Sequence, residues 1–372
     1  MNATREDVYD LVVIGGGQAG LATGHAARLA GLRHLIIDAG ARTGDTWRDR
    51  YDSLTLFTPR AYSQLPGLDL EGDPDGYPTK DEIADYLEAY ASTFDLPVQH
   101  SRPARRVSAT PGRGLSVETS QGSLQARSVV VATGPFQRPR TPAWAGELTV
   151  PQLHSAEYRN PGDVQGARVL VVGGGNSGAQ IAEDLARLGR AVTWAVSAAP
   201  RYVPSLVLGR SVFWWLDVTG VLTARGDSLR GRFLRRRGDP IFGGELREMI
   251  AEGRVGQAPV AVGAQGSHGE RVVFADGSTD TFEGVVWCTG FVNDYAWLDI
   301  PWAIGPDGVP AHRAGISTAD ARVGFVGLGW QYSRNSGLVG GVGADASRIV
   351  ARLSDQARLH KERHGLQVKA VS

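Results

Sequence analysis

The chain has 372 residues, which is long enough for two well-cored domains. Its hydrophobic content of 42% and charged content of 21% are ordinary for a globular protein. Its 39 basic and 39 acidic residues cancel, so no overall field attracts phosphate backbones or anionic lipid, and nucleic-acid binding is not expected. The single cysteine, Cys288, excludes an intrachain disulfide and a redox dithiol.

The apolar stretches predict neither a secretion signal nor a membrane span. Polar residues 1–7 run directly into a short apolar stretch at 11–14, which is not the pattern of a signal peptide. The most apolar aromatic stretch, 212–222, contains Asp217 and is much shorter than the ~20 residues that cross a bilayer. We therefore expect a cytoplasmic protein.

A glycine-rich turn follows the first apolar stretch. Residues 15–20 read GGGQAG and fit the G-x-G-x-x-G fingerprint between a strand and a helix. The first glycine permits the turn, the second lets the backbone approach a pyrophosphate, and the third allows the helix to pack closely on the strand. The helix N-terminus offers unpaired N–H groups to the phosphates. The candidate contacts are Gly15, Gly17, Gln18, Ala19 and Gly20.

The same pattern returns near the middle of the chain, where 169–172 lead into GGGNSG at 173–178. The helix after each turn is followed by a glycine at the same offset, Gly31 in one copy and Gly189 in the other. One glycine-rich turn is weak evidence in a chain with 49 glycines, but two matched copies predict two dinucleotide sites. The second copy contributes Gly173, Gly175, Asn176, Ser177 and Gly178 as candidate contacts.

The second strand of each copy separates the two sites. Asp38 stands about 20 residues after the first fingerprint, where a carboxylate accepts hydrogen bonds from a ribose diol. The same distance along the second copy reaches Val196, so no carboxylate repels a 2′-phosphate, and Arg201 follows. This predicts NADPH at the second site, with NADH tolerated. A solvated loop arginine stays open as the alternative for Arg201.

Local patterns predict further elements outside the two copies. They are a helix opened by a capping box at Thr79, a three-stranded meander over 105–108, 115–119 and 124–131, a hairpin with its turn at 276–277, and a strand at 285–287. The stretch 211–222 has two interpretations, an apolar helix packed on the core or a lid near a substrate entrance.

Longer motifs add a resemblance that the glycine-rich turns cannot supply. Residues 44–47 resemble a G-G-x-W turn, with Asp45 where a glycine is usual. Further motifs are matched by residues 51–60, 62–67, 131–134, 153–161 and 287–291. On these residues the chain resembles the class B flavin-dependent monooxygenases, in the CzcO-type branch of bacterial flavin-containing monooxygenase-like proteins, nearly from end to end.

The chain departs from the family pattern at a few positions. Leu148 and Val150 stand where the F-x-G-x-x-x-H-x-x-x-Y signature has Phe and Gly, whereas His154 and Tyr158 fit it. Thr58 lies at about the position where the larger monooxygenases carry an Asn near the flavin. For His154 two interpretations stay open, a proton shuttle and a structural link near the crossing between domains.

The resemblance implies an α/β fold with two Rossmann-like dinucleotide-binding domains in the three-layer, glutathione-reductase-like arrangement. A discontinuous FAD-binding domain would comprise 1–150 and 295–372, with an inserted NAD(P)H-binding domain at 151–294. Residues 327–353 are expected to return as a strand, a loop and a glycine-rich helix. The N-terminus of that helix would stabilise the anionic reduced flavin by roughly 0.3–2 kcal/mol.

The expected cofactor contacts add motif residues to those of the two turns. For FAD they are Asp38, Thr46, Trp47, Thr58, Val107, Ala132, Thr133, Gly134 and Gln331. For NADPH they are Arg201, Thr289 and Gly290. A surface loop position is the alternative for Gln331. No side chain is assigned as acid, base or nucleophile, and no metal site is expected.

The activity that the resemblance implies is an NADPH-consuming, FAD-dependent monooxygenation. Hydride passes to FAD, O₂ gives a C4a-hydroperoxyflavin, and one oxygen reaches a sulfur or nitrogen of a small organic substrate. One alternative is an NAD(P)H-dependent flavin oxidoreductase that passes electrons to an acceptor without oxygenation. Another is a non-catalytic NADPH-binding redox sensor. A homodimer stays open.

Overall fold

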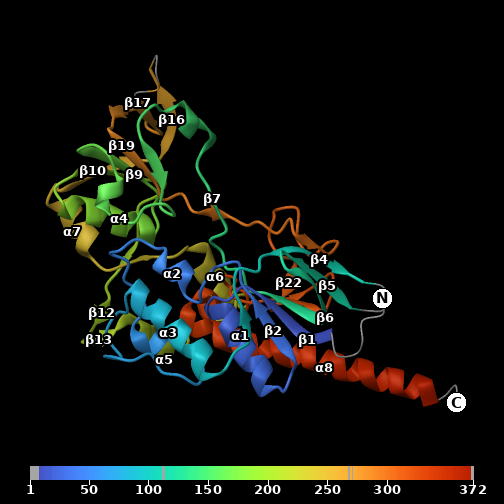
Figure 1. Ribbon diagram of the computed structural model, residues 1–372. Helices are drawn as coiled ribbons and strands as arrows, with labels where there is room; N and C mark the ends of the chain where they lie inside the picture. The colour runs from blue at the N-terminus through green and yellow to red at the C-terminus, as the bar shows by residue number, and fades with distance from the viewer. Residues whose placement is uncertain (1–7, 111–113, 267–268, 270, 370–372) are drawn as a thin grey trace.

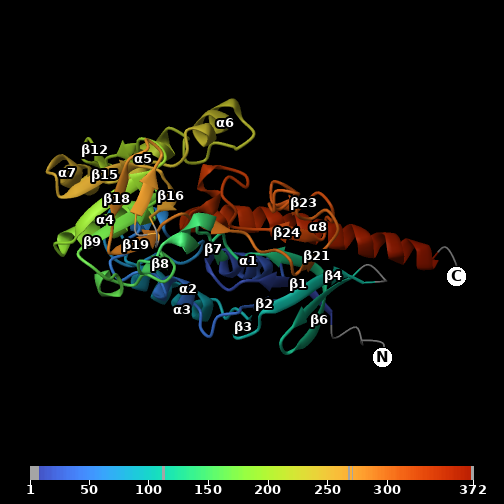
Figure 2. The same cartoon turned by 90° about the horizontal axis from the view of Figure 1, so that it is seen from above.

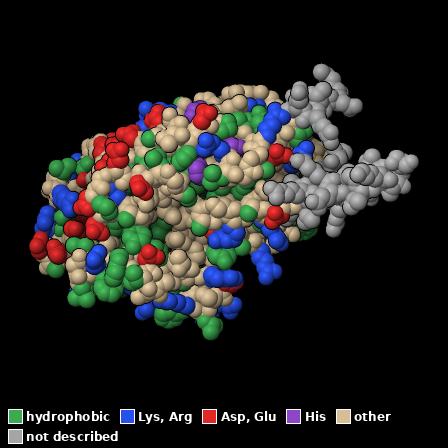
Figure 3. Space-filling model, turned by 90° about the horizontal axis from the view of Figure 1, so that it is seen from below, with side chains coloured by type: hydrophobic (Ala, Val, Ile, Leu, Met, Phe, Trp, Pro, Cys, Tyr) green, Lys and Arg blue, Asp and Glu red, His purple; other side chains and the backbone are tan. Residues whose placement is uncertain are grey.

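The structure is a computed structural model that describes residues 8–369 except 111–113, 267, 268 and 270. Two sheets organise these residues, one of ten strands and one of five (Figure 1). No helix in the described part of the chain is long and apolar enough to cross a membrane. Acidic and basic side chains share the face seen in Figure 3, in keeping with their equal totals.

The ten-stranded sheet joins strands from both ends of the chain. Its main path runs β21-β4-β5-β6-β1-β2-β3, and β24 pairs in parallel with β6 at the side of the meander. The strands are β1 (Val8–Ile14), β2 (His34–Ile37), β3 (Val98–Gln99), β4 (Ala104–Ala109), β5 (Leu115–Thr119), β6 (Gly122–Val131), β21 (Leu298–Asp299), β22 (His312–Arg313), β23 (Ile316–Ser317) and β24 (Val323–Phe325).

Three helices cover one face of this sheet, α1 (Gln18–Leu29), α3 (Lys80–Thr93) and α8 (Val342–Lys369). Their apolar side chains form one core with Leu11, Val13 and Ile36. The alternate strand residues Val12 and Ile14 face a second core under the meander. This alternation buries β1 on both sides. The first unit, which is built around this sheet, therefore has three layers, which are the helices, the sheet and the meander.

The five-stranded sheet is entirely parallel, in the order β15-β10-β9-β19-β8. Its strands are β8 (Gln152–His154), β9 (Arg168–Val172), β10 (Ala191–Val196), β15 (Val255–Pro259) and β19 (Gly284–Trp287). Helices α4 (Asn176–Arg187) and α7 (Glu245–Ala251) pack on one face. The small sheet of β16 (Ala261–Gln265), β17 (Arg271–Phe274) and β18 (Thr279–Thr281) covers the other.

Two segments of the chain cross between the two sheets. They pair with each other as the short strands β7 (Arg138–Pro139) and β20 (Phe291–Val292). An insertion after β10 leaves the second sheet and reaches the loop before α8, on the side seen in Figure 2. It contains β11 (Tyr202–Val203), β12 (Leu206–Val207), β13 (Arg210–Ser211), α5 (Val212–Val218), α6 (Leu229–Arg236) and β14 (Ile241–Phe242).

The local predictions agree with these elements. Thr79 is the N-cap of α3 and makes both bonds of a capping box with Glu82. The meander is β4-β5-β6, and the hairpin is β17-β18. One prediction was wrong, because the strand expected within 327–353 ends earlier, at Phe325. Gly327 already has φ +90°, a turn conformation that cannot continue a strand.

Candidate functional site

The first glycine-rich turn joins β1 to α1, and each glycine there has a different neighbour. Gly15 has φ +108° and lies against the Ala132 carbonyl, and a Cβ on Gly20 would overlap the Gly15 carbonyl. A Cβ on Gly17, in contrast, would meet no atom within 4 Å. Gly15 and Gly20 are therefore needed for the packing of the turn itself, while Gly17 faces open space beside the helix N-terminus.

Asp38 follows β2 and holds the first turn directly. One of its carboxylate oxygens accepts a short hydrogen bond from the Gly16 N–H, and the other accepts from the Gly40 N–H at 2.6 Å. The side chain is half-buried at the edge of the turn. A carboxylate therefore lies at the end of the second strand, where the sequence predicts a ribose contact.

Two segments bring further predicted FAD contacts close to the turn. Trp47, in the short helix α2 (Asp45–Arg48), donates from its indole Nε1 to Gln18 Oε1 at 3.2 Å, and Thr46 lies beside it, exposed. Ala132, which touches Gly15, begins a loop stabilised by a hydrogen bond from Gln137 Nε2 to Thr133 Oγ1 at 3.0 Å. Gly134 in that loop has φ +69°.

Three other predicted contacts are buried. Thr58 Oγ1 lies 2.6 Å from Ser63 Oγ. Val107 is fully buried in the core under the meander, and its N–H donates to the Trp297 carbonyl. Gln331 is only 5% exposed: its Oε1 accepts from the Leu328 N–H, while its Nε2 has no partner among the described residues. The Gln331 amide therefore lies inside the protein rather than on a surface loop.

The second turn repeats the geometry of the first. Gly173 has φ +132° and lies against the Cys288 carbonyl, and a Cβ on Gly178 would overlap the Gly173 carbonyl. A Cβ on Gly175 would meet nothing within 4 Å. Val196 lies beside Gly174 in this turn, at the place that Asp38 takes beside Gly16 in the first turn.

The polar residues predicted around the second turn have different surroundings. Ser177 is exposed, whereas Asn176 is bonded on both sides of its amide, donating to the Pro240 carbonyl and accepting from the Phe242 N–H, each at 3.3 Å. Arg201 is exposed and donates to the carbonyls of Arg237 and Gly238 at 2.7 and 2.6 Å. Asn176 thus joins the insertion to α4, and Arg201 joins two parts of the insertion to each other.

Thr289 and Gly290 lie on the crossing segment after β19. The Thr289 hydroxyl donates to the Arg140 carbonyl, and its own carbonyl accepts from Arg140 Nε at 3.1 Å. His154 Nε2 lies 3.0 Å from the Gly290 carbonyl, and its Nδ1 accepts from the Ala156 N–H at 3.1 Å. Burial lowers the pKa of His154, and the contact of its Nε2 with the Gly290 carbonyl joins β8 to the crossing segment after β19.

Sequence reasoning missed Arg50, which lies at the same crossing. Its guanidinium carbon is 4.4 Å from the ring centre of Phe136 and 5.9 Å from that of Phe291, one phenylalanine on each crossing segment. Burial lowers the pKa of Arg50 below its usual value. Only the R-Y dipeptide within a matched motif could have drawn attention to it, because the phenylalanines are far away in the chain.

A cavity of about 330 Å³ lies beside the segment that contains Thr58 and Ser63. The side chains of Tyr62, Phe213, Leu222 and Leu338 line it together with the amides Gln64 and Asn335. Phe213, in the stretch 211–222, is buried in a core and also forms a wall of this cavity. Aromatic walls with a few polar groups are typical of small-molecule sites.

Comparison with known proteins gives one family match and several similar chains. Residues 12–206 match the family described as pyridine nucleotide-disulphide oxidoreductase. The chain is 43% identical to an oxidoreductase of Geobacillus kaustophilus described as uncharacterized and CzcO-like, over 93% of this chain and 98% of that one.

Two solved structures are similar along nearly the whole chain. A flavin-containing monooxygenase from Stenotrophomonas maltophilia superposes with a TM-score of 0.79 at 30% identity, covering 94% of this chain and 99% of that one. A bacillithiol disulfide reductase from Bacillus cereus superposes with a TM-score of 0.69 at 17% identity, covering 94% and 99%. The second likeness shows the fold alone, with its two dinucleotide-binding units.

Proposed function

Because the chain belongs to the pyridine nucleotide-disulphide oxidoreductase family, we propose that it is a flavin-dependent monooxygenase that consumes NADPH. The observation that carries the proposal is the pair of matched turns, in each of which the middle glycine faces open space. The likeness to the Stenotrophomonas flavin-containing monooxygenase supports monooxygenation over other redox chemistry.

The residues of the first turn fit FAD. Gly17 leaves room for a pyrophosphate at the N-terminus of α1, and the Asp38 carboxylate stands where the adenosine ribose would be held. Trp47 and Thr58 would lie beside the isoalloxazine. The Nε2 of Gln331 is a buried donor without a partner among the described residues, which is unfavourable unless a group from the cofactor or a water accepts from it.

The residues of the second turn fit NADPH. Gly175 leaves the corresponding space at the N-terminus of α4, and Ser177 is exposed there. Val196 presents no negative charge to a 2′-phosphate, and Arg201, which is exposed, would approach it from the insertion. Thr289 and Gly290 would face the nicotinamide end, since they follow β19 at the carboxyl edge of the sheet.

The sheet pairing supports the division of the chain into an FAD domain, 1–150 and 295–372, and an inserted coenzyme domain, 151–294. Strands β21 and β24, which follow the coenzyme domain in the chain, pair with β4 and β6, which precede it. Among the described residues, strands β8 to β19 pair only with one another, in the five-stranded sheet and in the smaller sheets of the same stretch.

Bound FAD would take hydride from NADPH and then activate O₂, and the substrate would be a small molecule with a nucleophilic sulfur or nitrogen. The protein binds and orients the partners and keeps water away. The aromatic cavity beside Ser63 is the candidate substrate site. The oxygenated flavin that the sequence resemblance implies stays a prediction.

The alternative, electron transfer to a disulfide, finds little support in this chain. Cys288 is its single cysteine, and burial raises the pKa of the Cys288 thiol to about 12. A thiol that stays protonated is a poor nucleophile for disulfide exchange. An acceptor that needs no thiol would still be compatible with the site.

Incubation with NADPH, ¹⁸O₂ and a panel of thioethers and tertiary amines tests the proposal. We expect a product with one ¹⁸O atom per molecule, identified by mass spectrometry, and no label when only the water carries ¹⁸O. NADPH oxidation with a reduced acceptor and no labelled product would show a reductase instead. A protein that binds NADPH without turnover would be a sensor.

A further inference from the structure

The chain forms a first unit around the ten-stranded sheet and a second unit around the five-stranded sheet. Residues 51–55 follow the first strands of the first unit along the chain, but they are bonded to the second unit. The Tyr51 hydroxyl donates to Gln180 Oε1 at 2.5 Å, and Gln180 Nε2 donates back to the Thr55 carbonyl at 3.2 Å. Tyr51 is 3% exposed and belongs to the core of the five-stranded sheet. The segment is therefore built into the second unit.

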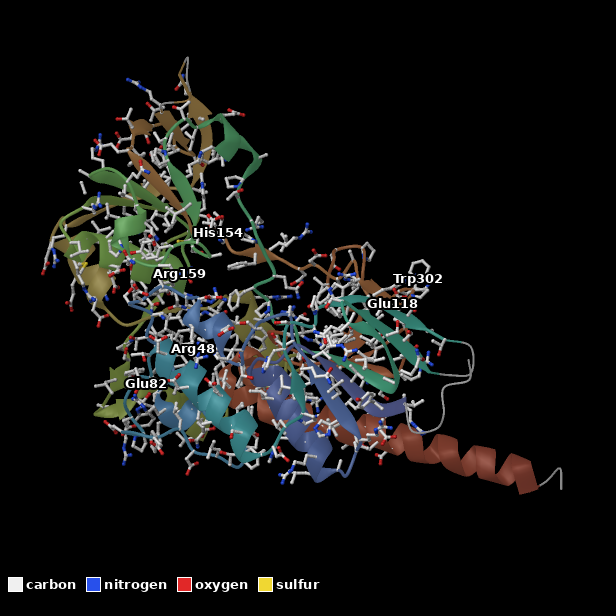
Figure 4. All side chains as sticks on the ribbon, viewed as in Figure 1. Arg48, Glu82, Glu118, His154, Arg159 and Trp302 are labelled. Atoms are coloured by element: carbon white, nitrogen blue, oxygen red, sulfur yellow. The ribbon has the colours of Figure 1, made fainter. Side chains whose placement is uncertain are left out.

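A second pair of bonds joins the same segment to α4. Ser53 Oγ donates to Asp184 Oδ2 at 3.0 Å, and the same oxygen accepts from the Tyr158 hydroxyl at 2.7 Å. Gln180 and Asp184 are four residues apart, so both lie on one face of α4. The Asp52 N–H also donates to the carbonyl of Arg159, which Figure 4 places at the edge of the second unit facing α2.

The other end of this stretch is held by the first unit. Four residues before Tyr51, Trp47 donates to Gln18, the first residue of α1. Arg48 fixes the same short helix to α3 through ion pairs with Asp85 and Glu88 at 2.7 and 2.8 Å. One short stretch of chain therefore contacts both helices that begin at the glycine-rich turns.

We propose that the 51–55 segment is a positioning element that sets α4, and the turn at its N-terminus, relative to the first turn, and that Tyr51 and Ser53 are its positioning residues. The inference rests on the proposed function, in which hydride passes between cofactors bound at the two turns. A misplacement of about 1 Å costs about 10²-fold in the rate of a step that needs close approach.

The Tyr51 hydroxyl bonds to Gln180 and the Ser53 hydroxyl bonds to Asp184, both on α4, so each residue acts through that helix and not on a reacting atom. Loss of a hydroxyl should therefore slow reduction of the flavin by bound NADPH while leaving NADPH affinity nearly unchanged. A residue that only supported folding would instead change cofactor content and thermal stability without this division between rate and affinity.

The test uses the full-length, FAD-loaded protein with Tyr51→Phe, Ser53→Ala and the combined variant. Tyr202→Phe is the matched control, because the Tyr202 hydroxyl packs near the same core with no hydrogen-bond partner among the described residues. Anaerobic stopped-flow mixing with a series of NADPH concentrations gives the limiting rate constant of flavin reduction and the NADPH Kd separately. Reduction by dithionite, which needs no coenzyme, is measured in parallel.

We expect each single variant to lower the limiting rate constant by about tenfold and the combined variant by up to about 10²-fold. The NADPH Kd, the dithionite rate and the Tyr202→Phe protein should stay within about threefold of wild type. Unchanged reduction in the combined variant, or an equal loss with dithionite, would overturn the inference alone. A wild-type protein that NADPH does not reduce would overturn the proposed function and this inference with it.

Discussion

The two glycine-rich turns share their backbone but differ in the residue beside them. In both, the first glycine has positive φ and lies against a neighbouring strand end, and the third packs on the carbonyl of the first. Beside the first turn a carboxylate, Asp38, accepts from the Gly16 N–H, whereas beside the second turn stands Val196. The same phosphate cradle can thus serve two nucleotides that are told apart at the ribose.

The helices after the two turns differ more than the turns do. Residues 19–27 of α1 are all buried, because the helix lies between the sheet and the helices α3 and α8. α4 buries one face and leaves Gln180, Glu183 and Asp184 on the side that meets the 51–55 segment and α7. The first helix is part of a closed core, and the second is the surface on which the two units meet.

The largest expected effect comes from a methyl group placed in the open space beside Gly17, where it would occupy the phosphate site without disturbing the turn. Gly17→Ala should weaken FAD binding by about 10²-fold or more, because two or more charge-assisted bonds to phosphate, each about 1.5–3 kcal/mol, would be lost. The folded protein should persist, since a Cβ there meets no protein atom. Flavin retention after gel filtration and thermal unfolding of the apoprotein measure the two effects.

Gly175→Ala is the matched control for that variant. It should retain FAD and lose NADPH binding instead, and both can be followed in the same preparation. The comparison between the turns would fail if either substitution weakened both cofactors equally, or if Gly17→Ala left flavin retention unchanged.

The next effect concerns the ribose end of the second site. Arg201→Ala should raise the KM for NADPH by about one to two orders of magnitude, because a charge-assisted bond to the 2′-phosphate contributes roughly 1.5–3 kcal/mol. The KM for NADH should barely change. The preference for NADPH in the wild type should also shrink as salt is raised, since the exposed pair is screened.

Steady-state kinetics with both coenzymes would measure this. Arg201 also donates to the carbonyls of Arg237 and Gly238, so its loss could loosen the insertion. An equal loss with NADPH and NADH would assign Arg201 to that structural role and remove it from the phosphate site.

A smaller effect distinguishes the two helices by pH. Eight residues after the middle glycine, α1 carries His25 and α4 carries Glu183. Burial lowers the pKa of His25, and burial with nearby Glu245 raises the pKa of Glu183 to about 7, from an ordinary value of 4.5. The folded state therefore binds a proton at Glu183 that the unfolded state has released, and stability falls as the pH rises from about 4.5 through 7.

Glu183→Gln removes this dependence. The variant should match the wild type near pH 4.5 and exceed its free energy of unfolding by about 1–3 kcal/mol above pH 7. Urea unfolding at a series of pH values measures the difference. A constant difference across the range would show that Glu183 titrates normally in the folded protein.

The smallest effect comes from the first of the two middle glycines. A Cβ on Gly174 would lie 3.5 Å from Val196 Cγ1, an ordinary contact, so Gly174→Ala should change stability by no more than about 0.5 kcal/mol. A Cβ on Gly16 would lie 2.9 Å from Asp38 Oδ2, so Gly16→Ala should displace the carboxylate and weaken FAD binding. Similar behaviour of the two alanine variants would contradict the assigned difference at the ribose.

The elements that local patterns determine could be predicted from the sequence. The turns, α1, α4, the meander and the capping box at Thr79 depend on residues close in the chain, and the structure contains each of them. Asp38 could be placed because the distance from turn to strand end is fixed by one helix and one strand.

What could not be predicted depends on contacts between distant residues. Tyr51 and Gln180 are 129 positions apart, and no periodicity in either segment indicates that the first enters the core of the second unit. The insertion after β10 is built from strands of two residues, too short for an alternating pattern. Asn176 illustrates both cases, since the turn was predicted but not its bonds to the insertion.

Anaerobic titration of the FAD-loaded protein with NADPH tests the central claim most directly, that FAD and NADPH bind at turns close enough for hydride transfer. The account predicts that the visible flavin absorbance bleaches with one NADPH per flavin, and that Gly175→Ala abolishes bleaching while dithionite still reduces the flavin. A flavin that stays oxidised in the presence of excess NADPH, or one that Gly175→Ala leaves fully reducible by NADPH, would contradict it.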